Sequence, residues 1–228
     1  MTASNKLSEA FVAGTVLEDA QVRIWSTKGP SFWALLSAIL IKAQPKSILE
    51  LGGGRSTTFL ADYAHRYRRT SITIESSHLW YRKIENDLKF MHLIGNFVEY
   101  VPLRKEKPVR WYDLDLFREA IAGRTFDLLF IDGPSGESRC HETGQAILRD
   151  LARSARMIIV DDTHRDYNMK FFQEASANYP KDCIFAFRYF NLLHIAVAPE
   201  WRQIVAECFA FLGLDPSGGR RELDPVSD

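Results

Sequence analysis

The chain has 228 residues, which is enough for one sizeable α/β domain and short for two. Hydrophobic residues make up 46% of the sequence and charged residues 25%, an ordinary balance for a soluble globular protein. The 29 Lys and Arg residues are balanced by 29 Asp and Glu residues, so the chain lacks the basic excess typical of nucleic-acid-binding proteins, and no nucleic-acid partner is expected.

From residue 31 onward, segments with strand and helix patterns alternate along the chain. Apolar residues at helical spacing follow Ser31, which can cap this helix, and Pro45 ends it. A mixed amphipathic pattern at 7–25 indicates one or two earlier helices. Strands are expected at 47–51, 71–75, 97–103, 126–132, 157–162, 184–190 and 192–197, and helices at 56–67, 78–90, 114–122, 141–153, 168–179 and 201–212.

This alternation predicts the fold class and the domain organisation. Five strands separated by helices indicate an α/β protein with a mostly parallel sheet and helices on both faces. The last two strands have only Asn191 between their apolar stretches, which predicts an antiparallel pair at the end of the sheet. We expect an N-terminal helical cap at 1–30, one α/β domain at 31–215 and a disordered tail at 216–228.

A glycine loop at the end of the first strand is the most informative part of the sequence, which reads ILELGGGRSTTFLA at 48–61. Its glycines let the backbone approach a ligand, and N–H groups at the following helix start can bind an anionic group. Gly52 and Gly54 match the first two glycines of the dinucleotide fingerprint G-x-G-x-x-G, but Thr57 takes the third position, which disfavours a pyrophosphate. No G-x-x-x-x-G-K-[ST] sequence occurs, which excludes a P-loop.

Acidic residues end four of the five strands that are expected to be parallel. They are Glu50, Glu75, Asp132 and the pair Asp161 and Asp162. Ligands of open α/β sheets bind beyond the carboxyl ends of the strands, so these side chains are expected to gather along one edge. Each acid alone also has a structural interpretation as a capping or turn residue. Together, buried carboxylates call for a cationic ligand, a metal ion or hydroxyl donors, and a nucleoside with a sulfonium and an amino-acid tail suits such an edge.

Several segments, in order along 31–198, carry a resemblance to a known family. ILELGGGRS resembles the first motif of class I S-adenosylmethionine-dependent methyltransferases, TIE resembles their second-strand acid, and FDLLFIDGPSG and MIIVDDTHR resemble their fourth and fifth strand ends. With VPL and WYD, the set is similar to a bacterial branch that shares features with small-molecule O-methyltransferases. The resemblance implies a Rossmann-like seven-stranded sheet, mostly parallel with a reversed final strand, and S-adenosylmethionine as the cofactor.

By position, the resemblance also implies roles for individual residues. Glu50 would order the loop or meet the ammonium group of the cofactor, Glu75 would bind the ribose hydroxyls, and Asp132 would approach the methionine end. Ser76 and Leu103 would lie near adenine. The full set of implied cofactor-binding residues is Glu50, Gly52, Gly54, Ser56, Glu75, Ser76, Leu103 and Asp132.

A metal ion and a catalytic base are further expectations. In the catechol-type relatives, acids after the fourth and fifth strands hold a divalent cation, and Asp132, Asp161 and Asp162 occupy comparable places, which implies a cation such as Mg²⁺. The sequence departs from that pattern, because IDGP replaces the usual segment and Asp162 stands where Asn is common, so metal use stays open. A base helps if the acceptor is a protonated hydroxyl or amine. His164 is the first candidate and His141 the second, and Asp132 is assigned to the catalytic group with His164.

The expected function is S-adenosylmethionine-dependent methyl transfer to a small-molecule acceptor, at oxygen. The alternatives are an NAD-dependent oxidoreductase and a cofactor-binding protein without catalysis. Three widely spaced cysteines without a CxxC pair, and an N-terminal sequence unlike a signal peptide, favour a reducing cytoplasmic location. The longest apolar run, around 32–41, is too short to cross a bilayer, so no membrane partner is expected. A homo-oligomer and the identity of the acceptor are left open.

Overall fold

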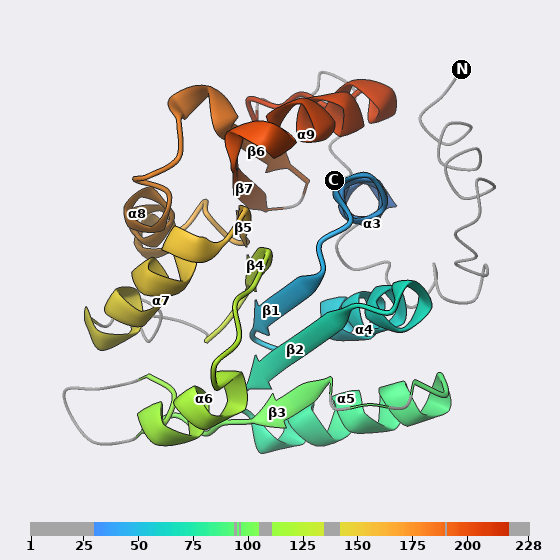
Figure 1. Cartoon of the computed structure of the whole chain (residues 1–228), viewed down its shortest axis with the longest axis vertical. Helices are drawn as coiled ribbons and strands as arrows, with labels where there is room; N and C mark the ends of the chain where they lie inside the picture. Colours follow the sequence, from blue (N-terminus) through green and yellow to red (C-terminus); the bar gives the residue numbers. More distant parts are fainter. Residues whose placement is uncertain are drawn as a thin grey trace, which may run out of the picture.

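One mixed sheet of seven strands organises the described part of the chain (Figure 1). The computed structural model describes residues 30–93, 95, 97–104, 111–134, 142–189 and 191–218. The strands lie in the order β3-β2-β1-β4-β5-β7-β6. Their bounds are β1 Ser47–Leu51, β2 Thr70–Glu75, β3 Val98–Tyr100, β4 Leu128–Ile131, β5 Met157–Val160, β6 Ile184–Arg188 and β7 Leu192–Val197.

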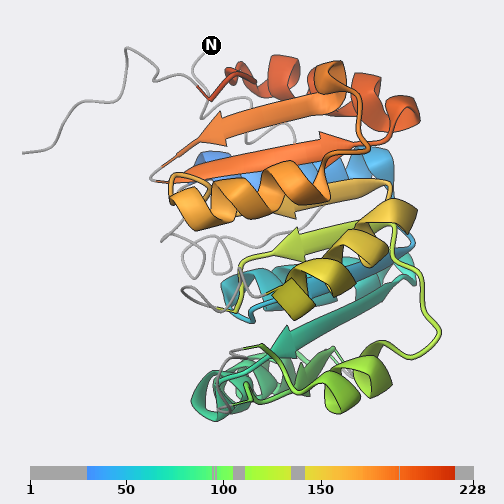
Figure 2. The ribbon, with the colours of Figure 1, turned by 90° about the vertical axis from the view of Figure 1, so that its left-hand side faces the viewer.

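The direction of the strands confirms the expected mostly parallel sheet with a reversed final strand. Strands β1 to β5 pair in parallel, whereas β7 pairs antiparallel with both β5 and β6. Figure 2 shows β7 pointing opposite to its two neighbours. The closely spaced pair β6 and β7 therefore forms the antiparallel end of the sheet that the single intervening residue Asn191 predicts.

Helices cover both faces of the sheet, as the alternation predicts. Their bounds are α3 Pro30–Ala43, α4 Arg55–Tyr67, α5 His78–Phe90, α6 Leu114–Ile121, α7 Glu142–Ser154, α8 Asp166–Ala175 and α9 Pro199–Leu212, with a short 3₁₀ helix at Lys181–Cys183. One buried apolar cluster joins α3, α4 and α9 to the sheet, and a second joins α6, α7 and α8 to the opposite face (Figure 1). In a third, smaller apolar cluster, residues of α5 pack against α4. Every residue of β4 and β5 is buried, as expected for strands covered on both sides.

Proline residues account for three differences between the expected and the observed element boundaries. Helix α3 begins at Pro30, one residue before the expected cap Ser31, and α9 begins at Pro199, because the fixed φ of proline suits the first helical position. Strand β3 has three residues instead of the expected seven, since it lies at the sheet edge and Pro102 has no N–H to donate. The expected helices at 7–25 and the cap at 1–30 lie outside the described residues, apart from Pro30.

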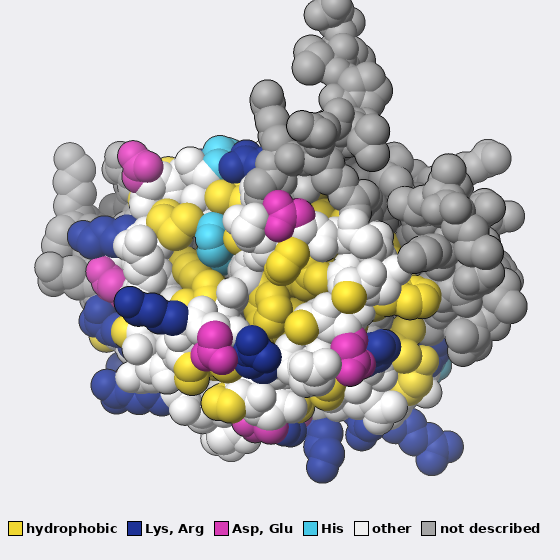
Figure 3. All heavy atoms as spheres, turned by 90° about the horizontal axis from the view of Figure 1, so that it is seen from above, with side chains coloured by type: hydrophobic (Ala, Val, Ile, Leu, Met, Phe, Trp, Pro, Cys, Tyr) yellow, Lys and Arg dark blue, Asp and Glu magenta, His cyan; other side chains and the backbone are white. Residues whose placement is uncertain are grey.

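The start of the expected C-terminal tail is in contact with the sheet. The carbonyl of Pro216 accepts a 2.7 Å hydrogen bond from the Ala186 N–H, and Ser217 forms a parallel bridge with the same residue. Arg188 Nε donates to the carbonyl of Gly218 at 3.0 Å. The rest of the tail, 219–228, lies outside the described residues. Over this end of the molecule, the surface mixes apolar, basic and acidic side chains (Figure 3). None of the described helices is long and apolar enough to cross a membrane.

The strand ends meet at one level, and this level positions the candidate site. Leu51 of β1 pairs with Ile131 of β4, which in turn pairs with the last residue of β5. As a result, the Asp132 N–H donates to the Leu51 carbonyl at 2.9 Å, and the Asp161 N–H donates to the Ile131 carbonyl at 3.0 Å. The acids that follow β4 and β5 are therefore neighbours at the carboxyl edge of the sheet, as predicted.

Candidate functional site

Each N–H group of the glycine loop has a fixed acceptor. The Gly52 N–H donates to the carbonyl of Ile74 at 2.9 Å, and the Gly53 N–H donates to Oε2 of Glu75 at 2.7 Å. The Gly54 N–H donates to Oγ1 of Thr57 at 3.0 Å, within the first turn of α4. The loop is thereby tied to β2 on one side and to α4 on the other, so its backbone is held in one shape before any ligand binds.

The two glycines expected to face a cofactor have different surroundings. Gly52 has a φ of +84°, and a Cβ atom there would lie 2.5 Å from the Cα of Gly133, so this glycine allows the loops after β1 and β4 to pack together. Gly54 has an extended backbone, and a Cβ atom there would meet no described atom within 4 Å. Of the two, Gly54 is the one that adjoins open space.

Glu50 is fully buried behind this loop and is held by hydroxyl groups. Its Oε2 accepts hydrogen bonds from Oγ1 of Thr73 at 2.6 Å and from Oγ1 of Thr57 at 2.7 Å. Its Oε1 is also buried and has no hydrogen bond of normal geometry among the described residues. Burial raises the pKa of Glu50 to about 7, although the hydroxyls of Ser56, Thr73 and Thr57 oppose this rise; the charge of Asp132 adds to it.

Glu75, at the end of β2, is engaged by backbone N–H groups. Its Oε2 accepts from Gly53, as above, and its Oε1 accepts from the Ser77 N–H at 2.5 Å. A carboxylate oxygen has a second lone pair, so each oxygen retains capacity for one more donor. Ser76 is partly exposed directly after β2, and Leu103 is partly buried where it bridges Tyr112. Both expected adenine neighbours therefore follow strands that end at the same edge of the sheet.

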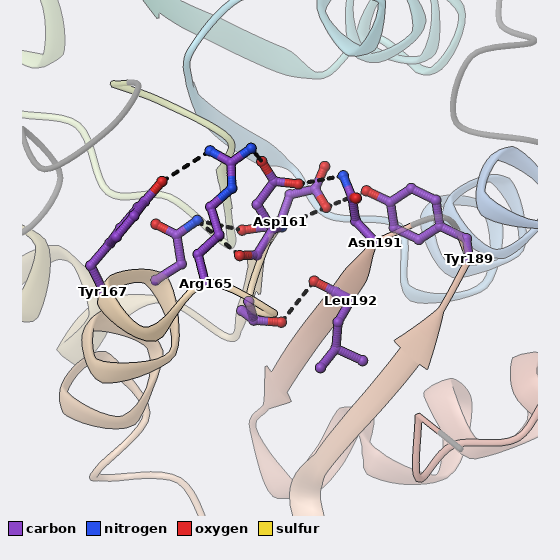
Figure 4. Close-up of polar contacts among 9 residues, drawn as sticks. Asp161, Arg165, Tyr167, Tyr189, Asn191 and Leu192 are labelled. Atoms are coloured by element: carbon purple, nitrogen blue, oxygen red, sulfur yellow. Dashed lines mark hydrogen bonds and ion pairs between the residues drawn. The ribbon is translucent and has the colours of Figure 1, made fainter. Parts of the chain in front are cut away.

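A second polar cluster lies at the end of β5 (Figure 4). Asp161, which is 1% exposed, accepts a short hydrogen bond from the Tyr189 hydroxyl and a 2.7 Å bond from the Asp162 N–H. Asp162 accepts from Nδ2 of Asn191 at 2.5 Å and forms an ion pair with Nη2 of Arg165 at 3.3 Å. Side chains from the turn after β5 and from the β6–β7 connection thus meet at one point.

The metal site expected at Asp132, Asp161 and Asp162 is not supported. Within the described ranges, no group of three or more His, Cys, Asp or Glu side chains is placed to hold a metal ion. The physical reason is that the carboxylates after β5 already have partners: Tyr189 donates to Asp161, and Arg165 supplies a positive charge to Asp162. The described residues therefore do not fit the divalent cation that the catechol-type resemblance implies.

The base candidates differ in their surroundings. His164 is exposed to solvent in the turn between β5 and α8, and His141 lies outside the described residues. A histidine that sequence reasoning missed, His194 of β7, is largely buried, and its Nδ1 lies 2.7 Å from Oγ1 of Thr163. Burial lowers the pKa of His194. Asp132 directly follows β4, close enough to Glu50 for its charge to affect that carboxyl.

Sequence reasoning also missed three partners of the acids, and two of them had a detectable signal. Thr73 pairs with Glu50 in the register of β1 and β2, so an adjacent pair of strands brings the hydroxyl to the acid. Arg165 stands three residues after Asp162, a spacing that allows contact across a turn. Tyr189 had no local signal, because it reaches the β5 end from the connection between β6 and β7.

The comparisons with known proteins bear on the fold. A crystal structure of a Staphylococcus aureus protein assigned as a caffeoyl-CoA O-methyltransferase has a TM-score of 0.50 and 15% identity, covering 87% of this chain and 92% of that one. The sheet order and this likeness decide the fold. The chain has the class I methyltransferase fold.

Further structures with a methyltransferase fold are similar at lower scores. The Podospora anserina methyltransferase PaMTH1, solved with S-adenosylhomocysteine, is 15% identical with a TM-score of 0.49, covering 86% of this chain and 94% of that one. Human methyltransferase-like protein 13, also solved with S-adenosylhomocysteine, is 13% identical with a TM-score of 0.47, covering 92% and 97%. No family model and no curated protein sequence matches the chain. The chemistry of this methyltransferase fold is therefore argued from its own residues.

Proposed function

We propose that the protein is an S-adenosylmethionine-dependent methyltransferase that methylates a small-molecule acceptor at oxygen. The observation that carries this proposal is the carboxyl group of Glu50. It lies fully buried behind the glycine loop, and its Oε1 has no partner of normal geometry among the described residues. A buried carboxylate oxygen without a well-aligned donor is costly, and a cationic ligand at the loop would relieve that cost, directly or through water.

The surrounding residues fit the three polar parts of this cofactor. The first turn of α4 carries the positive end of the helix dipole, which suits the carboxylate of an amino-acid tail. Glu50 suits the ammonium of the same tail. Glu75 suits the ribose diol, because each of its oxygens retains capacity for a hydroxyl donor. Gly54, whose Cβ position is open, leaves room for the tail between these groups.

The work left to the chain in such a reaction is mainly positioning. When bound, the cofactor supplies a methyl group activated by its sulfonium, and the transfer is an in-line displacement. The glycine loop, fixed by its own hydrogen bonds, holds the donor side. Asp132 and His164, in the loops that follow β4 and β5, are the residues that we propose to receive a proton from an acceptor hydroxyl.

The alternative of an NAD-dependent oxidoreductase fits the loop less well. At the position of the third fingerprint glycine, the Thr57 side chain accepts from the Gly54 N–H and donates to Glu50. A pyrophosphate at this loop would compete for the same N–H groups. It would also lie near the carboxyl groups of Glu50 and Asp132, which cannot neutralise its negative charge. A protein that binds the cofactor without catalysis remains one outcome of the test.

Titration calorimetry with S-adenosylmethionine and with NADH tests the proposal. The wild type is expected to bind S-adenosylmethionine saturably and NADH at least tenfold more weakly. Gly54→Val fills the open space beside the loop without backbone strain and is expected to weaken binding, while its thermal unfolding stays like that of the wild type. Absence of S-adenosylmethionine binding to the wild type would refute the proposal.

Catalysis is tested separately, with a radiolabelled methyl donor and a panel of hydroxylated small molecules. Methylation of an oxygen is expected for at least one acceptor class, and Asp132→Asn and His164→Ala are expected to lower its rate. Tight binding of S-adenosylmethionine, with no transfer to any member of the panel, would favour the non-catalytic alternative.

A further inference from the structure

The three aspartates at the carboxyl edge lie in one another's electrostatic field. Backbone pairing places Asp132 beside the end of β1 and Asp161 beside the end of β4. The pKa of Tyr189 is raised first by burial and then by the negative charges of Asp161, Asp132 and Asp162. The Tyr189 hydroxyl thus bonds directly to Asp161 and lies in the field of the acids that follow β4 and β5.

One guanidinium group in the same cluster belongs to Arg165. Its Nη2 lies 3.3 Å from Oδ2 of Asp162, and its Nη1 donates to the Tyr167 hydroxyl at 2.9 Å. The pKa of Arg165 is raised first by the hydrogen bond to Tyr167, and then by the charges of Asp162 and, less strongly, Asp132. The ion pair with Asp162 therefore places this positive charge at the carboxyl end of β5. Figure 4 shows the guanidinium between Tyr167 and the aspartates.

The turn after β5 is built to hold Arg165 in this place. Asp162 has a φ of +58°, so the chain reverses directly after the strand. Nδ2 of Asn168, a fully buried residue of α8, donates to the carbonyls of Asp161 at 3.3 Å and of Asp162 at 3.0 Å. Thr163 is tied to the Leu192 carbonyl by its N–H and its hydroxyl. With the turn fixed at these points, the side chain three residues after Asp162 reaches back over the strand ends.

We propose that Arg165 is the cation of this acidic edge and takes the place that a divalent metal ion holds in the catechol-type relatives. The guanidinium offsets the negative charge of Asp162 from within the chain. The Arg165 side chain, which is about half exposed, also keeps a positive charge in the turn after β5, where we propose that the acceptor binds. This second role rests on the proposed function and defines the acceptor class as a molecule with an anionic or readily ionised oxygen, which a guanidinium binds well.

A gain of metal binding tests the proposal without any need for an acceptor. Removing the guanidinium in Arg165→Met leaves Asp162, which follows the buried Asp161, without its ion-pair partner, and hard divalent cations prefer carboxylate oxygen. We expect Arg165→Met to bind Mn²⁺ at least tenfold more tightly than the wild type, measured by titration calorimetry and by the electron paramagnetic resonance signal of free Mn²⁺. Mn²⁺ is also expected to raise the melting temperature of Arg165→Met and to leave that of the wild type unchanged.

Two variants separate this effect from general loss of structure. Arg165→Lys keeps the positive charge and is expected to bind no more Mn²⁺ than the wild type. Arg149→Met removes an arginine of similar exposure, 43% against 46%, whose carboxylate partner is Glu174, between α7 and α8; it is expected to gain nothing. Adding Asp161→Asn to Arg165→Met is expected to abolish the gain.

Two results would overturn the proposal. One is tight Mn²⁺ binding by the wild type that Asp161→Asn removes, because the cation place would then be open to a metal. The other is equal Mn²⁺ affinity of the wild type and Arg165→Met. Titration of the same wild-type sample with S-adenosylmethionine reports on the proposed function independently, so the failure of one proposal is distinguishable from the failure of the other.

Discussion

The hydroxyl group of Thr57 donates a 2.7 Å hydrogen bond to the buried carboxylate of Glu50 and accepts a 3.0 Å bond from the Gly54 N–H. One side chain thus links the acid at the end of β1 to the glycine that adjoins open space. In a dinucleotide fingerprint this position would be a third glycine, which has no such side chain. The threonine explains how a loop with only two matching glycines keeps a fixed shape.

Thr57→Val removes this link with little change in volume. The buried carboxylate of Glu50 loses one donor and the Gly54 N–H loses its acceptor, so we expect a loss of about 1–3 kcal/mol in the free energy of unfolding. S-adenosylmethionine affinity is expected to fall as well. Urea denaturation and calorimetry measure the two effects. Thr58→Val, which loses only a hydroxyl bond to the Arg55 carbonyl, is the matched control and is expected to affect both less.

Glu50 makes the stability of the protein depend on pH. Its pKa is about 7 in the folded protein, against an ordinary value of 4.5, so between these values the folded state binds a proton that the unfolded state has released. The free energy of unfolding therefore falls as pH rises through this window, by on the order of 3 kcal/mol from this group. Glu50→Gln is expected to lose that part of the dependence. Denaturation of both proteins at pH 5 and pH 8 measures it, and parallel pH profiles would contradict it.

Alanine at the two matching glycines is expected to affect different properties, stability at Gly52 and cofactor binding at Gly54. Gly52→Ala places a Cβ atom 2.5 Å from the Cα of Gly133 at a φ of +84°, so it is expected to destabilise the fold by roughly 1–3 kcal/mol. Gly54→Ala meets no described atom within 4 Å and is expected to melt like the wild type while it weakens S-adenosylmethionine binding. Thermal unfolding and calorimetry of the pair measure this, and equal melting temperatures would show that the loops after β1 and β4 tolerate a side chain.

Tyr189→Phe tests whether the β5 end depends on the hydroxyl from the β6–β7 connection. Asp161, which is 1% exposed, would lose the strong donor that Tyr189 provides, so the free energy of unfolding is expected to fall by about 1–3 kcal/mol. Tyr100→Phe, at a half-exposed position of the edge strand β3, is the control and is expected to change stability little. Equal urea midpoints for Tyr189→Phe and the wild type would show that Asp161 does not need this donor.

The fold and the location of the site could be read from the sequence because both depend on local patterns. Apolar runs ending in acids, such as the one at Glu50, placed five strands and their common edge, and the pairing of Leu51 with Ile131 then follows from strand adjacency. The partners of those acids could not be read in the same way. Tyr189 meets Asp161 only because the reversed strand β7 lies beside β5, and this contact spans 28 residues.

At the carboxyl edge of the sheet, too, the acids could be predicted from local sequence patterns, whereas their positively charged partner could not. The sequence indicates a cluster of acids and a need for a positive partner, but the partner depends on the left-handed φ of Asp162 and on the anchoring of that turn by Asn168. Such a backbone conformation at a non-glycine residue is uncommon, and the preference of aspartate for it does not identify the position from the sequence. The metal prediction is not supported among the described residues, where Asp162 is paired with a nearby arginine instead.

A crystal structure grown with S-adenosylhomocysteine and a manganese salt tests the central claim most directly. The account predicts that the ribose hydroxyls lie within hydrogen-bond distance of Glu75 and that the amino-acid tail lies beside Gly54 at the start of α4. It also predicts that Arg165 remains paired with Asp162 and that no Mn²⁺ is bound between the aspartates. A ligand bound away from the glycine loop, or no ligand at a saturating concentration, would contradict the account.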